Sequence, residues 1–170
     1  VQSTRATPGT VEVTRIHSGS AGDVVRIFDN DPRYLEVHGQ TGDDHITLLQ
    51  SAFADPTFGG LTVFGDDGDD TITGGTQADV LIGGLGSDTI TGGASNDVIV
   101  GDLAAVLRDE DYVVQRISTD RDDEGDTDTL TSTQGNDVVI GGAGSDTIEA
   151  LLGSSIILGD AGEVVFDDGS

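Results

Sequence analysis

The chain has 170 residues, with 32 acidic against 7 basic side chains and a formal net charge of -25 at pH 7. All the basic residues are Arg, and none lies between Tyr34 and Leu107 or after Asp122. This balance excludes nucleic acid, which requires basic patches, and anionic membrane surfaces as partners, and it favours cations. No apolar run approaches the roughly 18 residues of a membrane span, and the absence of Cys excludes a disulfide framework.

Residues 1–38 contain short alternating segments typical of strands, at Thr10–Ile16, Asp23–Phe28 and Tyr34–His38. We expect this part to be an N-terminal β segment, either a cap or the last coils of a preceding domain. Val1 is not Met and no signal peptide opens the sequence, so we expect a segment of a longer protein.

A nine-residue pattern begins at Gly39–Thr47, with Asp44 at position 6 and Ile46 at position 8. It degenerates through Leu48–Asp55, which would widen one coil, and it returns in Pro56–Phe64 with Leu61 in place of the Asp. We expect that last unit to keep the coil and to lose its metal ligand.

Four units in phase then fill Gly65–Val100, reading GDDGDDTIT, GGTQADVLI, GGLGSDTIT and GGASNDVIV. Position 6 is always Asp, at Asp70, Asp79, Asp88 and Asp97, and position 8 is always aliphatic, at Ile72, Leu81, Ile90 and Ile99. Glycine and short polar residues at positions 1–6 favour a tight turn. β-branched and aliphatic residues at positions 7–9 favour a short strand, and stacked copies would align position 8 as one interior column.

This nonapeptide resembles the haemolysin-type (RTX) calcium-binding repeat. The resemblance implies an all-β fold, a right-handed parallel β-roll (solenoid) in which each coil uses two nonapeptides and several calcium ions lie between successive turns. Charge supports the same interpretation. In a two-unit coil Asp70 would lie over Asp88, and Asp79 over Asp97, about 4.8 Å away. Carboxylates so close repel each other, and Ca²⁺ bound by several oxygens would resolve the repulsion, whereas zinc is disfavoured without Cys.

After Val100 the register breaks. Residues 103–131 are expected to be an insert, in which Tyr112–Ser118 and Asp128–Thr133 are predicted as two strands around a charged turn. Acidic residues between Asp120 and Asp128 have an EF-hand-like spacing, but position 12 is Thr131 instead of Glu, which favours a solvated acidic turn.

The register resumes at Ser132–Ile140 and Gly141–Glu149, with Asp137 and Asp146 at position 6, and Ser155 replaces the Asp in the next unit. Two short echoes link the segments. Gly101–Asp109 resembles Gly159–Asp167, and Val13–Ser18 resembles Val114–Thr119, which suggests modules of repeat arrays alternating with β segments.

We therefore divide the chain into an N-terminal β segment or cap (1–38), a first β-roll array (39–102), an inserted hairpin-like segment (103–131) and a second array (132–170). The predicted metal ligands are the position-6 carboxylates Asp44, Asp70, Asp79, Asp88, Asp97, Asp137 and Asp146. Secondary candidates are the turn residues Asp67, Asp102 and Asp160.

Positions 7 and 9 of each unit should point outward. They are Thr in the first and third units of the continuous array, giving a polar face. In the second and fourth units they form an apolar stripe, Val80, Ile82, Val98 and Val100. An exposed stripe of this kind needs cover, so we expect the insert, the N-terminal strands or a partner to pack on it.

The sequence contains no catalytic motif such as His-Glu-x-x-His or Gly-x-Ser-x-Gly, so we predict no enzyme activity and no catalytic residues. The resemblance implies a structural module of a secreted or surface-displayed bacterial protein, an adhesin or giant exoprotein exported by type I secretion, whose partners are calcium and neighbouring modules. The alternative is the calcium-dependent folding and secretion domain of a protease or lipase. An ice-ordering threonine face is a remote third interpretation, because only two Thr-x-Thr rungs match.

Overall fold

The computed structural model describes residues 14–19, 24–27, 35–48, 61–109, 113–119 and 125–166. These residues form only strands and turns, and no helix among them is long and apolar enough to cross a membrane. The strands are β1 (Thr14–Gly19), β2 (Val24–Ile27), β3 (Leu35–Thr41), β4 (His45–Leu48), β5 (Thr62–Asp67), β6 (Thr71–Thr73), β7 (Val80–Leu85), β8 (Thr89–Thr91), β9 (Val98–Asp102), β10 (Ala104–Arg108), β11 (Val114–Thr119), β12 (Thr129–Gln134), β13 (Val138–Ile140), β14 (Thr147–Leu152), β15 (Ile156–Leu158) and β16 (Glu163–Val165).

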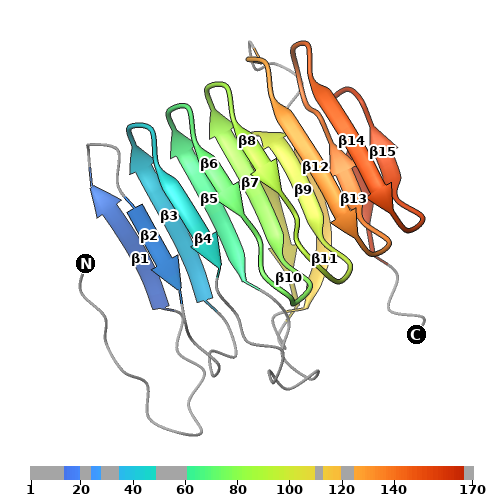
Figure 1. Cartoon of the computed structure of the whole chain (residues 1–170), viewed down its shortest axis with the longest axis horizontal. Helices are drawn as coiled ribbons and strands as arrows, with labels where there is room; N and C mark the ends of the chain where they lie inside the picture. The colour runs from blue at the N-terminus through green and yellow to red at the C-terminus, as the bar shows by residue number, and fades with distance from the viewer. Residues whose placement is uncertain are drawn as a thin grey trace, which may run out of the picture.

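Two parallel sheets build the roll (Figure 1). One has seven strands in the order β1-β3-β5-β7-β9-β13-β15, and the other has six in the order β14-β12-β8-β6-β4-β2. Successive coils give one strand to each sheet, so neighbouring strands in a sheet come from neighbouring coils. The all-β parallel β-roll predicted from the repeat is confirmed, and among the described residues β1 and β2 are the outermost strands at its N-terminal end.

Position 8 of the repeat forms the interior of the roll. In the seven-stranded sheet one register row joins Val37, Val63, Leu81, Ile99 and Val139, and in the six-stranded sheet another joins Ile46, Ile72, Ile90 and Leu130. All nine side chains are fully buried in one cluster. Burying each aliphatic side chain contributes about 1.5–3 kcal/mol, which a three-residue strand gains only because its neighbours stack on it.

A third sheet covers the apolar stripe. Its strands β10, β11 and β16 are antiparallel, in the order β10-β11-β16. Ile117 of β11 is fully buried against Val80, Ile82, Val98 and Val100, in a cluster that also includes Val138 and Ile140. Of the three expected covers (the insert, the N-terminal strands or a partner), the structure shows the insert on this stripe, and strand β16 completes the cover.

The insert contains an antiparallel hairpin, as predicted, but the hairpin joins β10 and β11 instead of the two predicted segments. The sequence pattern pairs residues 112–118 with Asp128–Thr133, whereas β11 pairs with β10 and β16, and β12 lies between β8 and β14 in the six-stranded sheet. The physical reason is that Asp128-Thr-Leu-Thr repeats the pattern of Asp70-Thr-Ile-Thr, so Leu130 takes an interior position instead of a hairpin position.

The two sequence echoes have different outcomes. Segments 101–109 and 159–167 supply β10 and β16, which flank β11 on opposite sides and are thus structurally equivalent. Segments 13–18 and 114–119 supply β1 of the roll and β11 of the covering sheet, so that likeness has no structural counterpart. The widened coil of residues 49–55 and the acidic residues 120–124 lie outside the described residues.

Candidate calcium site in the stacked turns

The turns between the two sheets stack their position-6 carboxylates in two columns. The first turn column, after the seven-stranded sheet, contains Asp44, Asp70, Asp88, Asp128 and Asp146; the second, after the six-stranded sheet, contains Asp79, Asp97 and Asp137. All but the partly exposed Asp146 are at most 2% exposed. Leu61 and Ser155 hold position 6 at the two ends of the second column, next to Asp79 and Asp137. Neither has a carboxylate, which is the replacement of Asp that the repeat register predicts at these two units.

In every column member except Asp44, the structure shows one carboxylate oxygen that joins its coil to the preceding coil. The Oδ1 atom of Asp88 accepts a hydrogen bond from the main-chain N–H of Asp70 at 2.8 Å, and Oδ1 of Asp97 accepts from the N–H of Asp79 at 2.9 Å. These partners are 18 residues apart, which confirms the predicted two-unit coil. Across the insert the separation becomes 40 residues, and Asp128 Oδ1 accepts from the Asp88 N–H at 2.8 Å.

The second oxygen is buried without a hydrogen bond in five of these residues: Asp70, Asp88, Asp97, Asp128 and Asp146. Two other members of the columns do satisfy this oxygen. Asp79 Oδ2 accepts from the Gly75 N–H at 3.0 Å, and Asp137 Oδ2 accepts from the Ser132 hydroxyl. A buried carboxylate oxygen without a partner is costly, because it has lost its hydration without compensation. The five oxygens therefore need a proton or a cation.

Glycine carbonyls lie beside these oxygens. A Cβ atom added at Gly83 would lie 2.1 Å from Asp88 Oδ2 and 2.3 Å from the carbonyl oxygen of Gly101. Added at Gly101, it would lie 2.1 Å from Asp128 Oδ2 and 2.4 Å from the carbonyl oxygen of Gly141. Each of these two carboxylate oxygens, which have no hydrogen bond, thus lies beside the position-1 carbonyl oxygen of the next coil. The small space between the two oxygens, too narrow for a Cβ atom, is called the cradle below. Mixed carboxylate and carbonyl oxygens are the ligands that calcium prefers.

Glycine also provides the backbone conformation of these turns. Positions 2 and 4 are left-handed, as at Gly84 (φ 124°) and Gly86 (φ 116°). Asp66 (φ 74°) and Gln40 (φ 81°) hold the same conformation at position 2 of neighbouring turns. Gly and Asp tolerate this region better than most residues, so the predicted tight turn at positions 1–6 is confirmed.

The electrostatics of the columns oppose ionisation. Burial raises the pKa of Asp88 and of Asp97 to about 8, that of Asp128 to about 7 and that of Asp70 to about 6. The hydrogen bond from the neighbouring N–H lowers each pKa, and repulsion from stacked carboxylates raises it further. Bound positive charge would reverse these shifts and hold the carboxylates ionised.

No cluster of three or more His, Cys, Asp or Glu side chains that suits a metal ion occurs among the described residues. A cation in the turns would therefore take most of its ligands from main-chain carbonyls, with one or two carboxylates. This donor set suits Ca²⁺, which accepts many oxygens in flexible geometry, and does not suit zinc.

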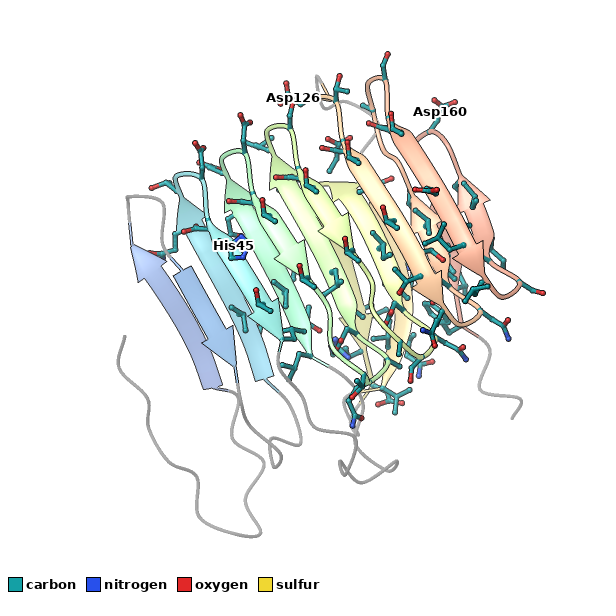
Figure 2. All side chains as sticks on the ribbon, in the orientation of Figure 1. His45, Asp126 and Asp160 are labelled. Atoms are coloured by element: carbon teal, nitrogen blue, oxygen red, sulfur yellow. The ribbon has the colours of Figure 1, made fainter. Side chains whose placement is uncertain are left out.

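The secondary candidates lie apart from the two columns. Asp67 is exposed, and Asp102 is buried with Oδ2 accepting from the Ala143 N–H. Asp160 is exposed on the turn after β15, and Figure 2 shows it at the rim of the roll. Asp126, at the same rim, binds the Gly86 N–H at 3.1 Å through Oδ2.

Asp128 is the column member that the repeat pattern did not predict. Its unit lacks the glycines that open the other units, so a search anchored on glycine passes over it. The signal that identifies it is Asp128-Thr-Leu-Thr, which matches positions 6–9 of the first and third units of the array.

A parallel roll whose stacked turns bury carboxylates against glycine carbonyls is a β-roll solenoid of the cation-binding type. The family model of the RTX calcium-binding nonapeptide repeat (4 copies) matches residues 62–90, 73–104 and 124–157. Over these parts of the chain the match confirms the resemblance to the RTX repeat seen in the sequence. Repeats of this family are structural and bind calcium. No curated protein and no solved structure matches the chain.

Proposed function

We propose that this chain is a calcium-dependent structural module of a large secreted or surface-displayed bacterial protein of RTX type, an adhesin or giant exoprotein. The observation that carries the proposal is the set of five buried Oδ2 atoms without partners, most of them beside a glycine carbonyl of the next coil. Stacked carboxylates in a chain that has no Arg or Lys between Tyr34 and Leu107 or after Asp122 fit a module that folds where calcium is abundant.

The proposed ligands are the position-6 carboxylates predicted from the sequence, together with Asp128. Asp88 and Asp97 contribute the most strongly affected oxygens, because both are buried with raised pKa. Glycine carbonyls of positions such as Gly101 and Gly141 complete the oxygen set. When bound, Ca²⁺ supplies the positive charge that these carboxylates lack.

The same residues would make folding conditional on calcium. In a low-calcium cytoplasm, repulsion and desolvation within the two columns oppose stacking, which keeps the chain unfolded for export. Outside the cell, the free energy of calcium binding becomes free energy of folding. The folded roll then serves as a rigid spacer or as a scaffold for neighbouring modules.

The placement in an adhesin or giant exoprotein, rather than in the secretion domain of an exoenzyme, is supported by the inserted strands. The repeat array is interrupted by β10 and β11 and then resumes in register, and a strand of equivalent role follows the second array. This alternation suits a long chain of similar modules. The full-length gene tests it, since further arrays with the same flanking segments support an adhesin and a catalytic domain supports the alternative.

The calcium proposal is tested by circular dichroism of the 170-residue chain during a calcium titration, with bound ions counted by calorimetry. We expect coil in chelator, β signal after calcium addition, and reversal by chelator. Asp88→Asn should raise the calcium concentration needed for folding, whereas Asp66→Asn, a matched change at a turn position outside the two columns, should leave it nearly unchanged. A chain that is equally folded with and without calcium would overturn the proposal.

A further inference from the structure

The two turn columns differ in how their carboxylates are satisfied. They lie at opposite edges of the roll, because the chain passes from one sheet to the other at both ends of the strands (Figure 1). Among the described residues, five carboxylate oxygens are buried without a hydrogen bond, and four of them belong to the first turn column, at Asp70, Asp88, Asp128 and Asp146. The second turn column has one, at Asp97. The need for positive charge is therefore concentrated at one edge of the roll.

In the first turn column the cradle recurs from coil to coil. A Cβ atom added at Gly65 would lie less than 3.0 Å from both Asp70 Oδ2 and the carbonyl oxygen of Gly83. The cradle is also rebuilt across the insert, because Gly101 precedes β10, Asp128 follows β11, and the two still lie together. The same pair of oxygens, one from a carboxylate and one from a carbonyl, lies beside the position-1 glycines Gly39, Gly65, Gly83, Gly101 and Gly141.

The two position-1 glycines of the second turn column lack this pair of oxygens. At Gly74 an added Cβ would meet the carbonyl oxygen of Gly92, but Asp79 Oδ2 accepts from the Gly75 N–H instead of lying beside that carbonyl. At Gly92 an added Cβ would lie 2.8 Å from Asp97 Oδ2, and no carbonyl oxygen of another coil is closer than 3.5 Å. Each of these turns thus offers a cation only half of the cradle.

Ser132 closes the next turn of the second column with a hydroxyl group. It replaces glycine at position 1, its side chain is fully buried, and its hydroxyl donates a hydrogen bond to Asp137 Oδ2. The protein itself therefore supplies the donor that the corresponding oxygens of the first turn column lack. The following unit has Ala150 at position 1 and Ser155 at position 6, so it has neither the glycine nor the carboxylate.

We propose that the calcium ions of the roll lie along the first turn column, whereas the second turn column is closed by hydrogen bonds within the protein. This inference rests on the calcium function proposed above and narrows its ligand set, leaving Asp97 as the candidate ligand of the second column. A cation stabilises most where a buried carboxylate oxygen has no other partner. Calcium also requires several oxygens, which a carboxylate and a carbonyl begin to supply and a lone carboxylate does not.

Asp88→Asn and Asp137→Asn test this assignment as a matched pair. Each keeps an oxygen that can accept from the N–H of the preceding coil, and each removes one carboxylate oxygen from its column. The free energy of unfolding, measured by denaturant titration, rises with the logarithm of the calcium concentration, and the slope counts the ions that only the folded chain binds. We expect Asp88→Asn to reduce this slope by at least one ion per chain and Asp137→Asn to leave it unchanged.

Equilibrium dialysis in saturating calcium counts the same ions directly, with circular dichroism of the same samples as a check on folding. Asp146→Asn, a second variant of the first turn column, should also lose at least one ion and replaces Asp88→Asn if that chain does not fold. A loss of ions in Asp137→Asn as large as in the first-column variants, or no loss in those variants, would overturn the assignment and leave the calcium proposal intact. A parent chain whose stability does not change with calcium would overturn both.

Discussion

Gly83→Ala tests the cradle between the turns most directly. The added Cβ would lie 2.3 Å from the carbonyl oxygen of Gly101 and 2.1 Å from Oδ2 of Asp88, where an ordinary contact begins at 3.4 Å. Two neighbouring coils would have to separate by about 1 Å at this turn. The clash would also occupy the space proposed for a cation.

The magnitude follows from what the added methyl group meets. Overpacking typically costs about 1–3 kcal/mol. A main-chain carbonyl held by a parallel ladder cannot rotate away as a side chain does, so we expect the upper end, about 3 kcal/mol, or roughly a hundredfold in the folding equilibrium. The free energy of unfolding in saturating calcium, measured by denaturant titration with circular dichroism, gives this quantity.

Gly159→Ala is the matched control. Gly159 holds position 1 of the turn after β15, and an added Cβ there meets nothing within 4 Å among the described residues. This variant should keep the stability of the parent chain or gain a few tenths of a kcal/mol from the less flexible unfolded state, about 0.4 kcal/mol at the lower end of such effects. Equal losses in the two variants, or no loss at Gly83, would refute the assignment of the cradle.

Three further predictions concern the columns and the covering sheet. Asp128→Asn should raise the calcium midpoint of folding several-fold in a circular dichroism titration, whereas Asp126→Asn at the exposed rim should not; equal midpoints would exclude Asp128 as a ligand. In chelator, lowering the pH from 8 to 5 should increase the β signal. The folded pKa of Asp88 is raised from 3.8 to about 8, so the folded state binds protons that the unfolded state has released, and stability is lost as pH rises through this window. A tenfold difference in proton affinity between the folded and unfolded states corresponds to about 1.4 kcal/mol of stability. A higher β signal at pH 8 than at pH 5 would contradict the predicted direction of the pH dependence. Ile117→Ala should cost about 2–5 kcal/mol in denaturant titrations, and Leu107→Ala, at a side chain 52% exposed, should stay within about 0.5 kcal/mol.

The repeat made much of the fold predictable. Asp at position 6 and an aliphatic residue at position 8 recur with a fixed period, so the coil length, the interior rows and the stacking of Asp70 over Asp88 all follow from the sequence. The tight turns follow as well, because left-handed backbone requires glycine or a tolerant polar residue. Local pattern and global structure agree here because each coil contacts mainly its neighbours.

The path of the chain through the insert did not follow from the sequence. The β10 strand resembles any short apolar segment, and its pairing with β11 depends on the stripe of Val80 and Val98 that both strands cover. Contacts of this kind join residues far apart in the chain, so a local pattern carries no information about them. Asp128 was missed for a different reason, since its unit lacks the two glycines that open most other units of the repeat.

The covering sheet changes how the roll can come apart. A stack of coils that contact only their neighbours can unfold from one end, one coil at a time. Here β16 follows the last coil and pairs with β11, which lies between β9 and β12 in the sequence but outside the two sheets of the roll. An ion pair of 3.1 Å between Arg116 and Glu163 also joins the two strands. The pairing of β16 with β11 connects the C-terminal coils to the middle of the roll, so we expect these coils and the covering sheet to unfold and refold together as one cooperative unit.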